Sequence, residues 1–196
     1  PAQEARFHAE DNVIIGNQIG LNADGLAAYG NGGNGIWVYG GHDTFIGGSG
    51  AQRNIISGNN LAGVNLDGGA YNSRVAGNLI GINASVLSRP NGSDGVVIQG
   101  GAHDNVIGAA GAGNIIAHNW GNGVLLKDAL TASNIVTSNV IITNTQAGVA
   151  LRLNAHDNYV RANDIRLNGN AGVLIDGGAN NNRIGEFGNR ALGNVI

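Results

Sequence analysis

The chain has 196 residues, including 35 glycines, two prolines and no cysteine or methionine; 42% of the residues are hydrophobic, 12% are charged, and the formal net charge is −3. This apolar content excludes a disordered chain, and the absence of cysteine excludes disulfides and cysteine metal ligands. Because Lys127 is the only lysine, there is no basic stripe for nucleic acid, and no apolar run is long enough to span a bilayer.

An asparagine-based unit recurs from about residue 12 to the end of the chain. At one position of the repeat, seven segments of the pattern Asn-x-(Ile, Leu or Val) begin at Asn17, Asn54, Asn78, Asn114, Asn139, Asn163 and Asn194. A polar residue precedes each of them, at Asn12, Thr44, Ser73, Asn105, Asn134, Asn158 and Asn182. A further asparagine follows the first six, at Asn22, Asn59, Asn83, Asn119, Asn144 and Asn168. A glycine before a β-branched residue then opens the next unit, at Gly35, Gly63, Gly95, Gly123, Gly148 and Gly172.

The shortest repeats have 24 or 25 residues, a period that is typical of solenoids. Each repeat contains three short apolar runs that alternate with period two, which predicts strands, and none is long enough for a helix. We call them the first, second and third strands of a repeat, beginning with the strand that follows the glycine. Glycine and asparagine at the corners favour tight bends, and a buried corner asparagine can bond to its equivalent in the next coil.

The sequence therefore predicts an all-β chain in which residues 1–196 form one parallel β-helix domain of about seven coils, with three strands per coil. A β-sandwich with glycine-rich turns is the alternative, but it gives no reason for the same asparagine spacing to recur. Residues 1–11 contain a possible N-terminal cap, at residues 5–10. The chain begins and ends within repeats, so we expect it to be a fragment of a larger protein.

Two stretches show the unit most clearly, Gly95–Gly108 (GVVIQGGAHDNVIG) and Gly172–Gly185 (GVLIDGGANNNRIG). Over residues 12–196 the chain resembles the right-handed parallel β-helix proteins of the pectin-lyase-like superfamily. The resemblance implies a right-handed helix. That superfamily includes lyases, hydrolases, epimerases, phage spikes, adhesins and non-catalytic surface modules, so the resemblance implies no single activity.

Insertions interrupt the repeat at two kinds of corner. Long ones, at residues 21–34 and 82–94, separate a third strand from the next first strand, and we expect them to form two walls around the first-strand face. Shorter ones, at residues 47–53, 108–113 and 185–193, precede a third strand. Insertions in repeat proteins often flank the binding surface.

The outward positions of the first strands form the predicted binding ribbon. One column contains Trp37 and Asn65, and the next contains Tyr39, Asp67, Gln99, Lys127 and Arg152. Neighbouring coils are about 4.8 Å apart, so these side chains form a continuous row. Aromatic groups beside acid, amide and base groups suit a sugar chain. The alternative is that the row is an ordinary polar solenoid face.

The same ribbon contains the candidates for catalysis, which are Asp67, Lys127 and Arg152. A lyase or C5-epimerase needs a base and a positive charge, and a glycoside hydrolase needs two carboxylates about 5–9 Å apart. Asp67 is the only acid in the middle of the ribbon. We therefore predict a non-catalytic scaffold, extracellular or at the cell surface, with a glycan-binding or partner-binding ribbon; the alternative is a polysaccharide-active enzyme of one of these three kinds.

No metal site or other cofactor is predicted. His103 and His156 align in alternate coils, which places them about 9.6 Å apart, too far to share an ion. The Asn22–Gly25 and Asn91–Gly95 turns offer oxygen atoms for calcium, but Asp, Asn and Gly are the usual residues of any turn.

An aliphatic strip predicts a contact with another chain. Ile55, Leu79, Ile115 and Val140 occupy the outward position of successive third strands, where polar residues are expected. Contiguous apolar surface of this kind marks an interface, in a homo-oligomer or with a different protein. The alternative is that the short inserted loops cover the strip.

Overall fold

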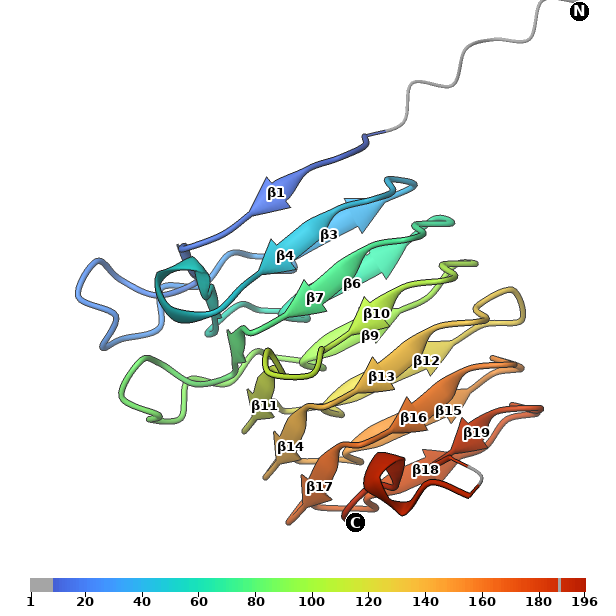
Figure 1. Cartoon of the computed structure of the whole chain (residues 1–196). Coiled ribbons are helices and arrows are strands. Elements are labelled where there is room, and N and C mark those ends of the chain that lie inside the picture. The colour runs from blue at the N-terminus through green and yellow to red at the C-terminus, as the bar shows by residue number, and fades with distance from the viewer. Residues whose placement is uncertain (1–8, 187) are drawn as a thin grey trace, which may run out of the picture.

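The computed structural model describes residues 9–186 and 188–196, and in these ranges the chain winds into three parallel sheets (Figure 1). The described residues include no α-helix, only two short 3-10 segments, η1 (Gly50–Gln52) and η2 (Arg190–Leu192). None of the described helical segments has the length and apolarity needed to cross a membrane.

The first-strand sheet contains six strands, in the order β18-β15-β12-β9-β6-β3. Their bounds are β3 (Ile36–Tyr39), β6 (Val64–Asp67), β9 (Val96–Ile98), β12 (Val124–Lys127), β15 (Val149–Arg152) and β18 (Val173–Ile175). The strand order follows the order of the repeats, so each coil hydrogen-bonds only to the coil before it and the coil after it.

The other two sheets have the same arrangement. The second-strand sheet has seven strands: β1 (Val13–Ile14), β4 (Phe45–Gly47), β7 (Arg74–Ala76), β10 (Val106–Ile107), β13 (Ile135–Thr137), β16 (Tyr159–Arg161) and β19 (Arg183–Ile184). The third-strand sheet has six: β2 (Gln18–Ile19), β5 (Ile55–Ile56), β8 (Leu79–Ile80), β11 (Ile115–Ala117), β14 (Val140–Ile142) and β17 (Asp164–Arg166). The paired strands of all three sheets run parallel, as predicted.

The prediction of seven coils is slightly too high, because the described helix has about six. The seven asparagine segments were counted as seven coils, but β1 and β2 precede the earliest strand of the first-strand sheet, β3. At the other end, the third strand of the last coil is reduced to a single bridge between Asp164 and Val195. The proposed cap at residues 5–10 lies largely outside the described residues.

One apolar column fills the interior of the helix. In the central coils the first-strand sheet contributes two inward side chains per coil and each of the other sheets contributes one, and these stack with their equivalents along the axis. The largest fully buried examples are Ile46, Ile56, Leu66, Ile80, Ile98, Ile107, Ile116, Leu126, Ile141, Leu151 and Ile165. Burial of each such side chain stabilises the fold by about 1.5–3 kcal/mol. Because both the strands and the core follow the repeat, the outward side chains are also aligned from coil to coil.

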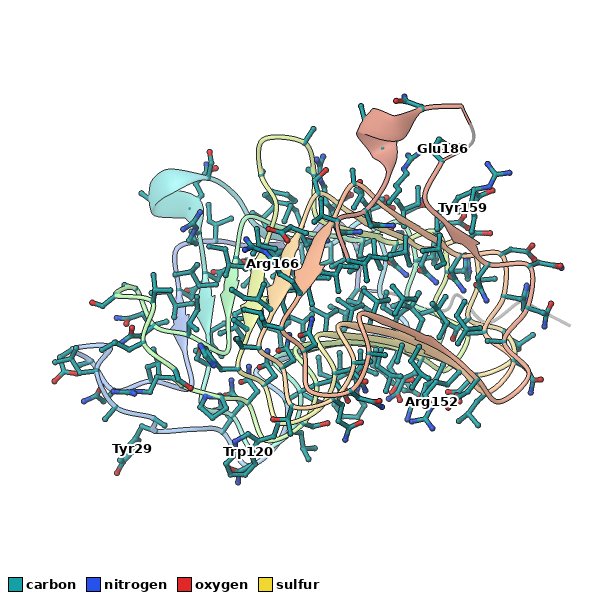
Figure 2. The ribbon with its side chains drawn as sticks, turned by 90° about the horizontal axis from the view of Figure 1, so that it is seen from below. Tyr29, Trp120, Arg152, Tyr159, Arg166 and Glu186 are labelled. Atoms are coloured by element: carbon teal, nitrogen blue, oxygen red, sulfur yellow. The ribbon has the colours of Figure 1, made fainter. Side chains whose placement is uncertain are left out.

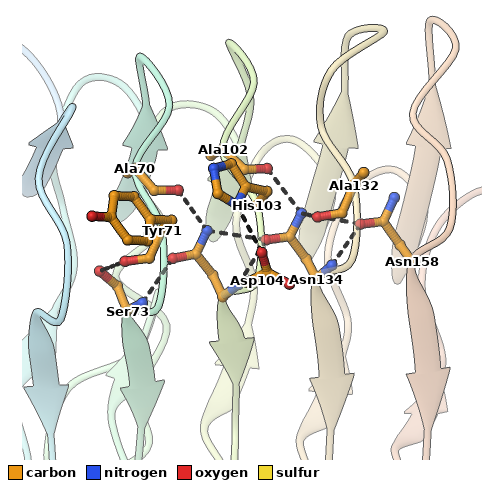
Figure 3. A network of polar contacts seen from close by, with 10 residues as sticks. Ala70, Tyr71, Ser73, Ala102, His103, Asp104, Ala132, Asn134 and Asn158 are labelled. Atoms are coloured by element: carbon orange, nitrogen blue, oxygen red, sulfur yellow. Dashed lines mark hydrogen bonds and ion pairs between the residues drawn. The ribbon is translucent and has the colours of Figure 1, made fainter.

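Buried asparagines form ladders at all three corners of the coil. Between the second and third strands, each of Asn17, Asn54, Asn78, Asn114, Asn139 and Asn163 donates a side-chain N–H to the Oδ1 of the next, ending at Asn194, over 2.8–3.0 Å. A shorter ladder before the second strands joins Asn105, Asn134 and Asn158, and Figure 3 shows part of it beside Ser73. The predicted amide ladder is confirmed.

The ladder before the first strands includes two residues that the repeat did not predict, Asn31 and Asn91. It runs through Asn31, Asn59, Asn91, Asn119, Asn144 and Asn168. Asn22 and Asn83 were predicted at two of these positions, and this prediction is wrong. Each begins a long insertion and accepts backbone N–H groups of that insertion, from Leu26 and Ala27 to Asn22, and from Ser85 and Leu87 to Asn83.

The two long insertions contact each other beside the third-strand sheet. Each closes through an antiparallel bridge, Leu21 to Ala28 and Ile82 to Ser88. The Asn83 Nδ2 donates to the Gly25 carbonyl over 3.1 Å, and the Arg89 guanidinium donates to the Leu26 carbonyl. The two insertions therefore project side by side and in contact, at the left of Figure 1, instead of forming two separate walls around the first-strand face.

Glycine is required where adjacent coils approach most closely. Gly108 follows β10 with a φ of +94°, and a Cβ atom there would lie 1.9 Å from the Thr137 carbonyl oxygen of the next coil. A side chain at this corner would force the coils apart, so the recurrence of glycine in the repeat follows directly from the spacing of the coils.

Candidate functional site

The outward face of the first-strand sheet has the register that the sequence predicted. Trp37 pairs with Asn65, and Tyr39 with Asp67, in β3 and β6, while Lys127 pairs with Arg152 in β12 and β15. At the edge of this face the rings of Trp37 and Tyr39 meet edge to face, with centroids 5.6 Å apart. Both rings are exposed, at 59% and 69%, so they offer apolar surface to a ligand.

A hydrogen-bonded group lies next to these rings. Asp67 accepts the Gly68 backbone N–H at Oδ1 over 2.6 Å and the Gln99 side-chain amide at Oδ2 over 2.9 Å. The Tyr39 ring lies over Gly68, where a Cβ atom would be 2.8 Å from the ring. The structure therefore brings Tyr39, Asp67 and Gln99 together, with the carboxylate held in a fixed position.

The three residues suspected of catalysis are not brought together. One coil separates β6 from β12, which places Asp67 and Lys127 about 9.6 Å apart along the sheet, and Arg152 is one coil further on. Arg152 instead forms an ion pair with Asp176, Nε to Oδ1 at 2.8 Å. The hydrogen bond to Asp176, and then the attraction of its charge, raise the pKa of Arg152 above its ordinary value.

A small groove of about 180 Å³ lies over the middle of this face. Asn65, Val97, Leu125 and Lys127 form its floor, and Asn34, Leu61, Ala62, Ser93, Asp94 and Gln99 complete its lining. Asn65 is only 6% exposed, and its Oδ1 atom has no hydrogen-bond partner. A buried amide oxygen without a partner lowers the stability of the folded state by about 1–3 kcal/mol. Asn65 therefore does not serve the stability of the fold.

Asp94 is the main residue of the groove that the ribbon prediction missed. It is 7% exposed, accepts the backbone and side-chain N–H groups of Asn122 at Oδ1 over 2.7 Å, and accepts the Ser93 hydroxyl at Oδ2. Asp94 precedes Gly95, the glycine that opens its first strand. Residues before this glycine in other repeats include Asn34 and Asn122, so a polar column at this position was visible in the sequence.

A larger pocket of about 690 Å³ lies at the corner between the third strands and the next first strands, beside the two long insertions. Arg89, Pro90, Asn60 and the exposed ring of Trp120 contribute to its lining. Figure 2 shows Tyr29, Trp120 and Arg152 projecting on the same side of the molecule. Asn60 and Gly92 line this pocket while their neighbours Leu61 and Ser93 line the groove, so the same two segments border both hollows.

Aromatic side chains form a stacked column at the corner between the first and second strands. The rings of His42, Tyr71 and His103 stack with centroids 4.7 and 5.3 Å apart, and each histidine Nδ1 contacts the following aspartate (Figure 3 shows Tyr71, His103 and Asp104). Among the described residues, no three His, Asp or Glu side chains are grouped so that they could hold a metal ion.

The turns considered for calcium use their oxygen atoms within the protein. Asn22 and Asp24 accept backbone N–H groups of their own loop. The Oδ1 of Asn91 accepts the Asn59 side chain in the ladder. These oxygen atoms therefore accept hydrogen bonds that stabilise the turn and the ladder.

The aliphatic strip stacks in register, as Ile55 to Leu79, Leu79 to Ile115 and Ile115 to Val140. Leu79 is only 4% exposed and packs with Ile82 and Ala117 in a small cluster outside the main core. Ile55, Ile115 and Val140 are half-buried. The first residue of the 82–94 insertion therefore covers part of the strip, and the interface stays a prediction for the rest.

Comparison with known proteins identifies the family. The family model described as "Right handed beta helix region" matches residues 11–187. Among solved structures, the chain is similar to a mutant of the periplasmic alginate epimerase AlgG, with a TM-score of 0.65 and 19% identity, covering 85% of this chain and 37% of that chain. The likeness at this identity concerns the fold, and the chain spans little more than a third of the epimerase. No curated protein matches the chain. The chain therefore belongs to the right-handed β-helix family.

Proposed function

We propose that this β-helix is a non-catalytic scaffold that binds a polysaccharide on its first-strand face, outside the cytoplasm. The observation that carries the proposal is the exposed Trp37–Tyr39 pair at the edge of a continuous row of polar groups. A sugar ring has apolar C–H faces that stack on aromatic rings and hydroxyl groups that need several hydrogen-bond partners. The row supplies both in a direction parallel to the helix axis.

The arrangement of the charged groups supports binding over catalysis. A general base must reach the proton that it removes, and both Asp67 oxygens already accept hydrogen bonds from the protein. Arg152 is paired with Asp176 and is separated from Asp67 by two coils. A pre-positioned carboxylate of this kind suits the recognition of hydroxyl groups.

The alternative is a polysaccharide lyase, C5-epimerase or hydrolase that uses Asp67, Lys127 and Arg152. It is favoured by the structural likeness to a protein described as a periplasmic alginate epimerase. The same likeness supports the proposed location, since that protein is described as periplasmic. Incubation with uronate polymers separates the two functions: a lyase creates a new ultraviolet absorbance, and an epimerase changes the proton spectrum of the polymer.

The proposal is tested by applying the protein to a glycan array, with the Trp37→Ala/Tyr39→Ala double variant beside it. We expect the wild-type chain to bind a defined group of glycans, and the variant to lose at least tenfold in affinity because two stacking surfaces are removed, each worth about 0.5–1.5 kcal/mol beyond its area. Both rings are exposed, so the unfolding temperature should change little. Equal binding by the variant would remove this face from consideration.

A further inference from the structure

The groove over Asn65 identifies the kind of sugar, an inference that rests on the proposed function. We propose that this groove receives a neutral, hydroxyl-bearing sugar residue and discriminates against uronates and other acidic sugars. Three features carry the proposal: the unpaired amide of Asn65, the buried carboxylate of Asp94, and the spacing between Asn65 and Trp37.

The Asn65 amide has unused capacity to bond. Its Oδ1 is buried without a partner, and it lines a groove whose floor otherwise includes Val97 and Leu125. Rotation about the last side-chain bond exchanges the oxygen and nitrogen of an amide, so either end can face the groove. A hydroxyl both donates and accepts, and so it can pair with whichever end faces it. A carboxylate only accepts, and would leave the amide oxygen unpaired.

The charges around the groove disfavour an anion. Asp94 lines the groove and is nine-tenths buried, so its charge is poorly screened by water. Lys127 is the one cation among the lining residues, and the carboxylate of Asp67 is hydrogen-bonded to Gln99, another residue of the lining. Arg152, the next cation along the row, is paired with Asp176. The lining of the groove therefore holds one negative and one positive side chain, and it has no net positive charge to attract a bound carboxylate.

The position of Trp37 relative to Asn65 matches one sugar ring. The two residues are direct partners in β3 and β6, so their Cα atoms are about 4.8 Å apart. A ring that stacks on Trp37 would therefore place a hydroxyl on its edge toward Asn65 and the groove. The small volume of the groove, about 180 Å³, suits part of a single residue rather than a branched chain.

The test compares hexasaccharides of neutral glucose, mannose and xylose with hexamers of galacturonate, mannuronate and guluronate, by calorimetry on the wild-type chain. We expect a neutral hexamer to bind at least tenfold more tightly than any acidic one. Tighter binding of an acidic hexamer would overturn this inference and leave the proposed function intact. A chain that binds no hexamer would overturn both.

Two variants test the residues directly. Asn65→Leu should lower the affinity for the neutral hexamer about five- to tenfold while the unfolding temperature stays the same or rises, because a buried unpaired amide is replaced by an apolar group of similar size. A purely structural role would instead lower the unfolding temperature. Asn170→Leu, at an exposed corner, is the control. Unchanged affinity in Asn65→Leu would overturn the inference.

Asp94→Asn keeps an oxygen acceptor for Asn122 and removes the charge. We expect it to strengthen binding of the acidic hexamers at least threefold, with little effect on the neutral ones, because a buried like charge repels the ligand carboxylate. Asp157→Asn removes one negative charge from a distant corner and should have no such effect. An equal gain in both variants would mean that net charge, and not the groove, determines the selectivity.

Discussion

Asn59 donates its side-chain amide to the Oδ1 of Asn91 over 3.0 Å, although 32 residues separate them. The same Asn91 oxygen accepts the Asn59 backbone N–H, and the Asn91 amide continues to Asn119. The 82–94 insertion therefore leaves the helix and returns to it without interrupting the ladder. This continuity explains how the chain carries a long loop at one corner while its first-strand face stays regular.

The asparagine ladder should contribute strongly to stability. Asn139 accepts two N–H groups of Asn114 and donates to Asn163 and to the Ile107 carbonyl. We expect Asn139→Ala to lower the free energy of unfolding by about 1–3 kcal/mol for the groups left unpaired. Urea denaturation measures the change, with the exposed Asn170→Ala as control. A variant as stable as the wild type would show that the ladder contributes nothing net.

The contact between the two long insertions should depend on Arg89. Its guanidinium donates to the Leu26 carbonyl of the other insertion. We expect Arg89→Ala to increase hydrogen exchange at residues 22–28 several-fold, because the Asn83 to Gly25 bond is then the one described hydrogen bond that still joins the two insertions. Arg74→Ala, on an exposed strand position, is the control. Unaltered exchange would indicate that each loop is stable by itself.

Asp67 should act in binding and contribute little to stability. Asp67→Ala removes the acceptor for Gln99, so the Gln99 amide loses its fixed position. We expect glycan affinity to fall several-fold while the unfolding temperature changes by little, since partly exposed hydrogen bonds contribute about 0.5–1.5 kcal/mol. Calorimetry and thermal melts measure the two effects. A variant that binds normally would place the ligand elsewhere on the surface.

The half-buried part of the aliphatic strip should mediate self-association. Ile115 and Val140 are adjacent in register and half-buried, and Ile115 packs against the Leu79 cluster. We expect Ile115→Glu combined with Val140→Glu to convert an oligomer into a folded monomer in analytical ultracentrifugation, because burying such side chains is worth about 1.5–3 kcal/mol each. Leu79→Ala serves as a comparison, since it should destabilise the chain and leave association unchanged. A wild-type chain that is monomeric at high concentration would contradict the prediction.

The repeat in the sequence was sufficient to predict the strands, their parallel pairing and the alignment of the outward side chains. Trp37 with Asn65 and Lys127 with Arg152 are in the predicted register. The reason is that hydrophobic alternation and corner residues are local signals, and stacking equivalent residues converts a sequence period directly into a spatial neighbourhood.

Only the tertiary structure decided which asparagine enters the ladder at each insertion and which residues of the groove are buried. Asn83 and Asn91 flank the same loop and have the same chemistry, so the one that enters the ladder depends on where the loop closes, through the Ile82 to Ser88 bridge. In the same way, the burial of Asn65 and Asp94 depends on how the end of that loop meets the neighbouring coils. These are contacts between segments far apart in the chain, and no local pattern in the sequence encodes them.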